Sequence, residues 1–460
     1  MEILYLDFYH FLKEKALILF LIVSFACNGQ DGFKLSDGLR SDKIKFELSN
    51  NLIIIPVELN GVKLSFILDT GVGSTILFSI DKRASLELKN ASKILLRGLG
   101  NDAPAEAIKS TGNLLKIGNT YSNNHTVYMI FDETMNFSPM MGFPVHGIIG
   151  YDFFKEFILN ISYSKEFIKI FDPESYKYKK CKKCYQTDLD LSNGRKRPLV
   201  KAKYKTDKGL IDVNLLLDSG SSSALWLFEN PEINLNVPED SFEDFLGTGF
   251  NGEIYGQKTK VESLHIGDFK INEVTASFPD SLFIQGISLK NRQGSIGGSV
   301  LRRFNMIMDY PNQKITFKKN NFFYKPFHYN MSGLTIQHSG VRVSKDYNLR
   351  KAPSKPSLGF VTNDSNGKIL VDVLKADAST FIYSLQPEYK ITEVRPDSPA
   401  AIAGLLKGDK VLEVNGRKSY LYKLSDLNDL FYSEEGKKIT IKVERLGVEI
   451  KFMFFLKKVI

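Results

Sequence analysis

Short runs of apolar residues, broken by turn residues, recur along most of the chain. Residues 52–59 form one such run, Asn60-Gly61 follows, and residues 62–68 form a second run in which apolar and polar positions alternate. Alternation with a period of two predicts a strand with one buried face, and Asn-Gly between two such runs is a strong hairpin signal. Strands with Gly-rich turns continue from there, so we expect an all-β architecture with few helices.

The same order of elements appears a second time. Residues 199–204 and 210–217 flank the turn Asp207-Lys208-Gly209, as a second hairpin would. Near the end of each half lies a further predicted strand pair, at 157–162 with 167–171 and at 305–310 with 314–318. Self-similarity over this length indicates a duplicated lobe.

Each predicted hairpin ends in an Asp-hydroxyl-Gly motif. The first copy is Phe66-Ile67-Leu68-Asp69-Thr70-Gly71 and the second is Leu215-Leu216-Leu217-Asp218-Ser219-Gly220. An apolar-Gly signature closes each half, at His146-Gly147-Ile148-Ile149-Gly150 and at Gly294-Ser295-Ile296-Gly297-Gly298, 81 positions after Asp69 and 80 after Asp218. A single Asp-Thr-Gly usually marks a turn. Two copies with matching partners predict that the two aspartates are counterparts.

The last third of the chain has a different pattern. Residues 321–380 are rich in Pro, Ser, Asn and Lys, which is typical of a connecting segment that is partly structured. From 381 onward we expect strands at 390–394, 438–444 and 448–456, a short helix beginning near Pro399, and a helix capped by Ser425 that runs to Phe431. This order predicts a small α+β domain.

Composition agrees with about three folded domains in 460 residues. Apolar residues make up 43% of the chain and include 34 Phe, which excludes wholesale disorder. The net charge of +9 is spread along the chain and no nucleic-acid-binding motif is present, so we expect no nucleic-acid partner.

The N-terminus has the pattern of an export signal. Lys13 and Lys15 precede an apolar run at 16–26 that is too short to span a bilayer; a buried core helix is the alternative. Ser24-Phe25-Ala26-Cys27 resembles the bacterial lipobox, which would make Cys27 the lipidated first residue, and plain cleavage near Ala26 is the other alternative. Either form of processing places the rest of the chain outside the cytoplasm.

Two further cysteines, Cys181 and Cys184, stand between the halves. An oxidising compartment permits a disulfide between them, and their pairing stays open at this level. They lack the further ligands of a zinc site and the strand-helix context of a redox motif. We therefore expect a structural or idle pair, and no metal.

Over residues 44–320 the paired motifs resemble aspartic peptidases of the retropepsin and pepsin type, specifically bacterial retropepsin-like domains in tandem. Ser398-Pro399-Ala400, Ala403-Gly404-Leu405, Gly408-Asp409 and Val414-Asn415-Gly416 resemble a bacterial PDZ domain. The expected fold is mainly β, with two retropepsin-like β-barrel lobes forming a pseudo-dimer and a PDZ-like α+β domain. The expected boundaries are a signal peptide at 1–27, lobe one at 44–173, lobe two at 195–320, a connecting segment at 321–380 and the PDZ-like domain at 381–460.

The resemblance implies roles for the motif residues. Asp69 and Asp218 would share one proton and activate a water molecule, with no metal, cofactor or covalent intermediate. Thr70 and Ser219 would hydrogen-bond across the two loops, and Gly71 and Gly220 would let backbone N–H groups approach the carboxylates. Because one chain carries both lobes, the site would form in cis in a monomer.

Two details of the motifs bear on activity. Ser221 keeps the hydroxyl that many pepsin-like enzymes place after the Gly, whereas Val72 lacks it, so we expect a raised pKa in the first loop and an optimum less acidic than that of pepsin. The Gly-rich runs Gly98-Leu99-Gly100 and Gly247-Thr248-Gly249-Phe250 are candidates for substrate flaps. Ordinary hairpin turns are the alternative interpretation.

We therefore expect an aspartic endopeptidase of the bacterial cell envelope, periplasmic or lipid-anchored, that hydrolyses proteins or peptides and carries a PDZ module for peptide recognition. A membrane contact would come only through the lipid on Cys27. The alternative is a catalytically inactive envelope protein that binds peptides with its PDZ domain by β-augmentation and uses the lobes as a scaffold.

Overall fold

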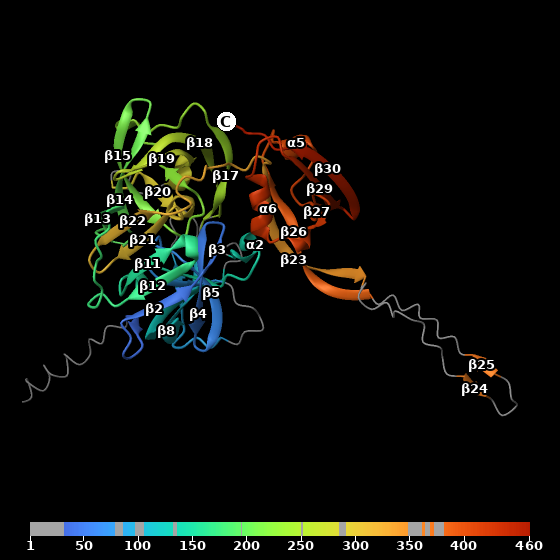
Figure 1. Cartoon of the computed structure of the whole chain (residues 1–460), viewed down its shortest axis with the longest axis horizontal. Helices are drawn as coiled ribbons and strands as arrows, with labels where there is room; N and C mark the ends of the chain where they lie inside the picture. Colours follow the sequence, from blue (N-terminus) through green and yellow to red (C-terminus); the bar gives the residue numbers. More distant parts are fainter. Residues whose placement is uncertain are drawn as a thin grey trace, which may run out of the picture. The chain divides into compact units, whose positions relative to one another are not determined.

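The computed structural model describes residues 32–78, 86–96, 105–131, 136–194, 196–249, 252–284, 291–347, 361–363, 369–371 and 381–460. The signal segment with Cys27, and the flap candidates Gly98, Leu99, Gly100 and Phe250, lie outside these residues. The chain divides into two compact units. The first contains both Asp motifs and, with Ile460, the residues up to Phe327 other than 138–143; the second contains residues 138–143 and 328–459 (Figure 1).

Lobe one is a β-barrel in which the hairpin that leads to Asp69 is central. The neighbouring strands follow the order β1-β9-β6-β10-β5-β4-β8-β7, and β8 also pairs with β9, which closes the sheet on itself. The strands are β1 (Lys34–Leu35), β3 (Glu47–Ser49), β4 (Leu52–Leu59), β5 (Val62–Leu68), β6 (Thr75–Leu77), β7 (Ser92–Leu96), β8 (Ala105–Ile117), β9 (Thr120–Ile130) and β10 (Gly147–Ile149). Alternating apolar side chains such as Phe66 and Leu68 fill the interior and are fully buried.

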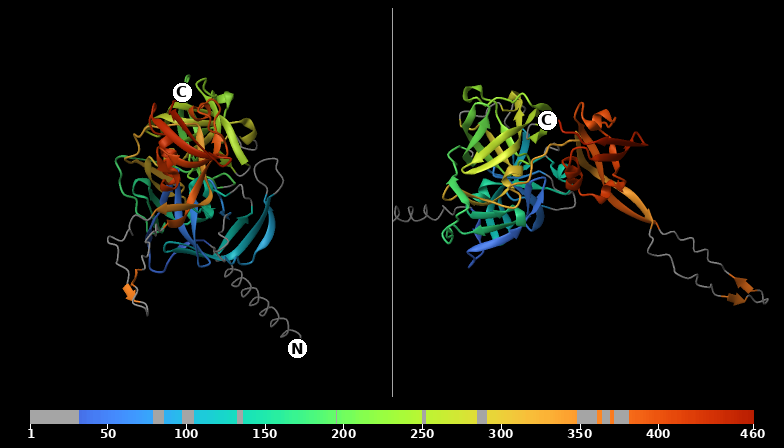
Figure 2. Two further views of the ribbon diagram at one scale, coloured as in Figure 1. Left: turned by 90° about the vertical axis from the view of Figure 1, so that its right-hand side faces the viewer. Right: turned by 45° about the horizontal axis from the view of Figure 1, so that its top comes forward.

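Lobe two repeats this plan. Its order is β14-β15-β20-β16-β19-β18-β17, and β14 also pairs with β18, so this sheet closes in the same way. Figure 2 shows these strands, drawn green to yellow, curving around a common interior. The strands are β14 (Leu199–Thr206), β15 (Gly209–Asp218), β16 (Leu225–Leu227), β17 (Phe242–Gly249), β18 (Gly252–Ile266), β19 (Phe269–Pro279) and β20 (Gly294–Gly297).

A third sheet joins the two lobes. Its order is β13-β22-β21-β11-β12-β2, and all of its pairings are antiparallel. Strand β11 of lobe one pairs directly with β21 of lobe two, from Ile158 opposite Asp309 to Ser162 opposite Asn305. The strands are β2 (Ser41–Lys45), β11 (Ile158–Ser162), β12 (Phe167–Phe171), β13 (Cys184–Asp188), β21 (Phe304–Asp309) and β22 (Lys314–Lys319). This sheet and both barrels share one hydrophobic core.

Helices in the first unit are short. Helix α3 (Tyr151–Phe154) follows β10, and α4 (Gly298–Leu301) follows β20 at the equivalent place. Single 3-10 turns occur at η2 (Tyr163–Lys165), η3 (Pro231–Ile233) and η4 (Ser281–Ile284). The expected fold class, mainly β with tandem barrels, is confirmed.

The second unit is a small sheet with helices beside it. Its order is β23-β26-β27-β29-β30, with β28 paired to β27, and it has its own hydrophobic core. Its elements are β23 (Leu334–Tyr347), β26 (Phe381–Val394), β27 (Lys410–Val414), β28 (Arg417–Lys418), β29 (Lys438–Arg445), β30 (Val448–Phe455), α2 (Ser138–Met141), α5 (Pro399–Ile402), α6 (Leu424–Phe431) and the turn η6 (Ser419–Leu421). A separate short pair joins β24 (Val361–Asn363) and β25 (Ile369–Val371).

Two features of this unit differ from the sequence expectation. The unit begins at His328, before residue 381, because β23 pairs with β26 along its length. Helix α6 begins at Leu424, so Ser425 lies inside it and is not the cap; the Asp426 carboxylate instead accepts a hydrogen bond from the Lys423 N–H. At α5 the expected start is present, since the Ser398 hydroxyl accepts a hydrogen bond from the Ala401 N–H at 3.2 Å. Within the described residues, no helix has the length and apolarity to cross a membrane.

Candidate active site

The two Asp motifs lie at equivalent ends of equivalent strands. Asp69 follows β5 directly and Asp218 is the last residue of β15. Each strand is flanked by the apolar-Gly strand of its own lobe in parallel, with Ile149 opposite Leu68 and Gly297 opposite Asp218. The similar spacing of the two motifs in each half of the sequence therefore corresponds to parallel pairing of the strands that carry them. Parallel neighbours need a long connection, so they come from distant parts of the chain.

Four hydrogen bonds lock the two loops together. The Thr70 hydroxyl donates to the Leu217 carbonyl at 2.6 Å, and the Ser219 hydroxyl donates to the Leu68 carbonyl at 2.7 Å. In return the Ser219 N–H donates to the Thr70 Oγ1 at 3.0 Å, and the Thr70 N–H donates to the Ser219 Oγ at 3.1 Å. Both side chains are buried, so losing one partner would leave unsatisfied polar groups in the interior. The lock fixes the position of one aspartate relative to the other.

The glycines of the motifs bring the two carboxyl groups to the same place. The Gly71 N–H donates to the Asp69 Oδ1 at 2.6 Å. A Cβ at Gly71 would lie 3.0 Å from the Asp69 Oδ1 and 3.2 Å from the Asp218 Oδ1, so the two carboxyls flank one glycine. A Cβ at Gly220 would lie 2.2 Å from the Asp69 Cγ, which no side chain tolerates.

The closing glycines pack against the loop backbones. A Cβ at Gly150 would lie 2.3 Å from the Val72 carbonyl oxygen, and one at Gly297 would lie 2.3 Å from the Ser223 carbonyl oxygen. The next residues also correspond, because the Tyr151 N–H donates to the Val72 carbonyl and the Gly298 N–H donates to the Ser221 carbonyl. The structural counterpart of Gly150 is therefore Gly297, one position before the residue used for the sequence spacing.

Burial dominates the electrostatics of the pair. It raises the pKa of Asp69 to about 7, with the negative charge of Asp218 as the second cause, while N–H groups of the loops and Arg197 oppose the rise. Burial also raises the pKa of Asp218, but the positive charges of Arg292 and Arg197 counteract it there. The two arginines therefore favour the negative charge on Asp218, and the pair titrates as a coupled unit. The raised pKa in the first loop has the direction expected from Val72, but its main cause is burial.

Sequence reasoning missed the two arginines. Arg197 precedes Pro198, whose carbonyl accepts a hydrogen bond from the Leu217 N–H at 2.9 Å, one residue before Asp218. Arg292 stands shortly before β20; its Nε donates to the Gly294 carbonyl at 3.1 Å, and its guanidinium lies 5.2 Å from the centre of the Phe228 ring. Arg197 sits in a basic run that resembles a solvated face. The sequence signal that could have identified Arg292 is its position, two residues before the apolar-Gly signature that begins at Gly294.

The described flap candidates, all in lobe two, lie near the end of a hairpin. Strands β17 and β18 pair from Phe242 to Gly249, with Thr248 opposite Glu253, so Gly247, Thr248 and Gly249 approach the turn between them. The ring of Tyr255 lies 5.6 Å from that of Phe245 on this hairpin. In lobe one, Leu96 pairs with Ala105, and the run Gly98-Leu99-Gly100 lies outside the described residues. Closure of these hairpins over a substrate stays a prediction.

Residues 55–153 match a family model described as aspartyl protease, and residues 390–445 match one described as PDZ domain. The chain combines an aspartyl protease domain with a C-terminal PDZ domain. A search of curated proteins found no match. Among solved structures, the crystal structure of the aspartic proteinase from Irpex lacteus is similar over 62% of this chain and 99% of that chain, at 11% sequence identity and a TM-score of 0.41.

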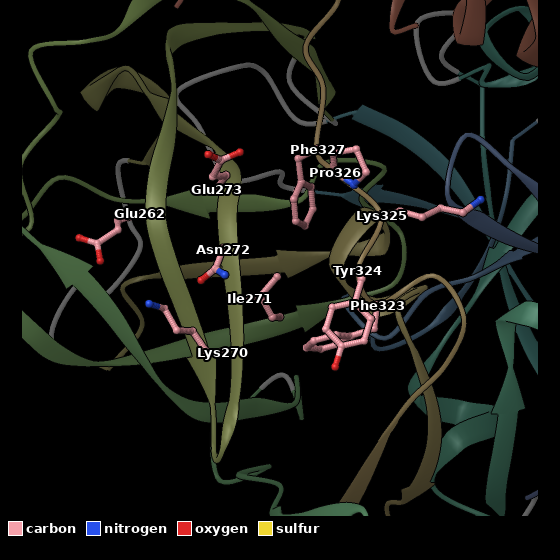
Figure 3. Close-up of a pocket in the computed structure, with 10 residues that line it drawn as sticks. All are labelled: Glu262, Lys270, Ile271, Asn272, Glu273, Phe323, Tyr324, Lys325, Pro326 and Phe327. Atoms are coloured by element: carbon pink, nitrogen blue, oxygen red, sulfur yellow. The ribbon is translucent and has the colours of Figure 1, made fainter. Parts of the chain in front are cut away.

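A surface cavity of about 540 Å³ lies on lobe two, apart from the protease-type loops. Residues of β18, β19 and the stretch after β22 line it (Figure 3). Figure 3 shows the Phe323 and Tyr324 rings close together on one side and the Lys325 side chain directed away. Neither Asp motif contributes to its lining, so this cavity is not where the two aspartates would act.

The two cysteines between the lobes are paired. Cys181 and Cys184 are joined by a disulfide, which resolves the question the sequence left open. Cys184 begins β13, so the bridge lies at the edge of the sheet that joins the lobes. Within the described part of the chain, no group of three or more His, Cys, Asp or Glu side chains is arranged to hold a metal ion.

Proposed function

We propose that this protein is an aspartic endopeptidase in which Asp69 and Asp218 form one catalytic dyad. The carrying observation is the pair of carboxyls that flank Gly71, held on two loops by the reciprocal Thr70 and Ser219 hydrogen bonds. Two carboxyls that share one proton near neutral pH supply a base and an acid at the same point, which general acid–base hydrolysis needs.

Each group has a distinct role in this reaction. Ionised Asp218 takes a proton from a water molecule while the water oxygen attacks the carbonyl carbon of the peptide bond. At the same time protonated Asp69 gives its proton to the carbonyl oxygen. The tetrahedral intermediate then collapses: Asp218 gives the proton that it took from water to the nitrogen, Asp69 takes a proton back from one hydroxyl of the intermediate, the C–N bond breaks, and a carboxylic acid and an amine leave. The lower pKa that Arg292 and Arg197 favour at Asp218 fits its role as base.

We also propose that the substrates are protein or peptide segments outside the bacterial cytoplasm. The signal-like residues 1–27 support export, and a disulfide between Cys181 and Cys184 suits an oxidising compartment. Lipidation of Cys27 would anchor the protein to a membrane, and cleavage near Ala26 would release it. The PDZ domain would recognise a peptide segment of a substrate or partner.

The test is cleavage of a mixed peptide library by residues 28–460 across the pH range, beside Asp69→Asn and Asp218→Asn. We expect the parent to cleave and each single variant to lose cleavage, because a dyad needs both carboxyls. Asp268→Asn, which changes an exposed turn residue of lobe two, is the matched control and should cleave like the parent. Cleavage that survives in either dyad variant contradicts the shared site.

One observation favours a second candidate function, an inactive peptide-binding protein. The PDZ match at residues 390–445 supports peptide capture without proteolysis. Absence of cleavage at every pH by the folded parent, with peptide binding unchanged in Asp69→Asn, would establish this alternative in place of the peptidase.

A further inference from the structure

The second unit has an open strand edge beside a helix. β23 lies at the end of the sheet order, so within the described residues its outer edge pairs with no strand. α6 also contacts β23. PDZ domains bind peptides by adding them to such a sheet edge. The edge of β23 and α6 together are called the PDZ groove below.

A short helix from elsewhere in the chain packs against both elements of this groove. α2 contacts both β23 and α6, and Ser138–Phe143 belongs to the second unit although residues on both sides of it belong to the first (Figure 1). Met141 is only 3% exposed. A Cβ at Gly142 would lie 2.8 Å from the Leu424 Cβ, so the segment passes close to the first residue of α6.

Lobe one holds both ends of this segment. The Phe137 ring packs edge-on against Phe78 at 5.2 Å. On the other side the His146 N–H donates to the Ser65 carbonyl at 2.8 Å, and the Ser65 N–H donates to the His146 Nδ1 at 3.0 Å. A ligand tethered at both ends has a high effective concentration, so it competes strongly with a free peptide.

The loop before β23 indicates which kind of peptide the groove accepts. The Asn330 Oδ1 accepts hydrogen bonds from the Ser332 N–H at 3.0 Å and the Gly333 N–H at 3.1 Å, and the Ser332 Oγ accepts one from the Leu334 N–H at 3.0 Å. Capture of a C-terminal carboxylate needs a nest of backbone N–H groups. Here the chain uses these groups itself, which favours an internal segment over a free C-terminus.

We propose that Ser138–Phe143 is a built-in ligand of the PDZ groove, and that the groove selects internal apolar segments of this type. A partner segment must then displace the built-in ligand to bind. The inference rests on the peptide-recognition part of the proposed function and is independent of the peptidase part.

The test measures binding of a fluorescent peptide with the sequence of residues 136–145 to the full chain. All proteins carry Asp69→Asn so that the probe stays intact. In Gly142→Ala the new methyl group collides with Leu424 and also strains a residue at φ +77°, which should expel the built-in segment. We expect the Kd of the probe to fall about tenfold or more. Hydrogen exchange should show the probe protecting β23 and α6.

The matched control is Gly436→Ala. Gly436 lies in the same unit and has the same φ of +77°, but a Cβ there would meet nothing within 4 Å, so probe binding should equal that of the parent. Met141→Ser is a second way to weaken the built-in ligand, because it removes a buried apolar side chain, and it should act like Gly142→Ala.

Three results would overturn the inference. The first is an equal Kd of the probe for the parent, Gly142→Ala and Met141→Ser. The second is that the probe binds to none of the three proteins. The third is clearly tighter binding of the probe with a free C-terminal carboxylate than of the probe with a C-terminal amide. Cleavage by the chain with native Asp69 is measured separately, so a failed peptidase proposal would be recognised independently.

Discussion

The position of the Asp69 carboxyl depends on closely packed neighbours, one of which is a glycine with no space for a side chain. Gly220 lies against the Asp69 carboxyl, and Thr70 and Ser219 hold the backbone on either side. Both hydroxyls are buried, as is the first loop from Asp69 to Val72, while Asp218 and Gly220 of the second loop are half-buried. At the scale of single residues, the site is therefore sensitive to one added methyl group.

Gly220→Ala tests this sensitivity. The added Cβ would lie 2.2 Å from the Asp69 Cγ and displace the Asp69 carboxyl, while the hydrogen bonds of Thr70 and Ser219 keep the loop backbones in place. We therefore expect kcat/KM for peptide cleavage to fall about 100-fold. Gly194→Ala is the control, because a Cβ there meets nothing within 4 Å and should leave kcat/KM unchanged. Equal activity of the two variants would mean that the dyad geometry is not what limits cleavage.

Arg292→Gln tests the electrostatics of the dyad. The positive charge of Arg292 lowers the pKa of Asp218, so its removal raises that pKa and the ionised form appears only at higher pH. We expect the acid limb of the kcat/KM profile to move to higher pH, while the basic limb stays near the pKa of about 7 of Asp69. The control is Arg40→Gln, which alters an exposed arginine of the same unit. An unmoved acid limb would contradict the role given to Arg292.

At the scale of elements, the pairing of β11 with β21 couples the lobes. Leu159 faces Met308 and Ile161 faces Met306 across this pair, and all four side chains are buried. The sequence predicted strands at 157–162 and 305–310, each paired within its own half. The alternating pattern could not show that these two strands would pair with each other. That partnership depends on the apolar surfaces the two lobes bury together.

Leu159→Ala should destabilise both lobes. It opens a cavity in the shared sheet and should lower the free energy of unfolding by about 2–5 kcal/mol. The single Trp of the chain, Trp226, lies in lobe two and reports unfolding there by its fluorescence in urea. We expect its transition to shift to lower urea even though the change is in lobe one. Lys169→Ala, an exposed change on neighbouring β12, should leave it in place.

At the scale of the whole molecule, the duplicated lobes place both aspartates in one chain. The proposed dyad then needs no second subunit, and specific activity should stay constant when the protein is diluted from about 10 µM to about 10 nM. A site assembled between two chains would lose activity on dilution. The measurement is the initial cleavage rate per mole of protein over this range.

The sequence by itself determined the local elements, the duplication and the resemblance to aspartic peptidases and PDZ domains. Period-two patterns, Asn-Gly turns and repeated Asp motifs are local signals, and each is legible without the fold. Tertiary structure decided the rest. Burial is the main cause of the raised pKa of Asp69, and it depends on residues far apart in the chain. The effect of Arg197 and Arg292 on the pKa of Asp218 depends on distant residues in the same way. The pairing of β23 with β26 and the place of Ser138–Phe143 in the second unit depend likewise on long-range contacts, which no local pattern encodes.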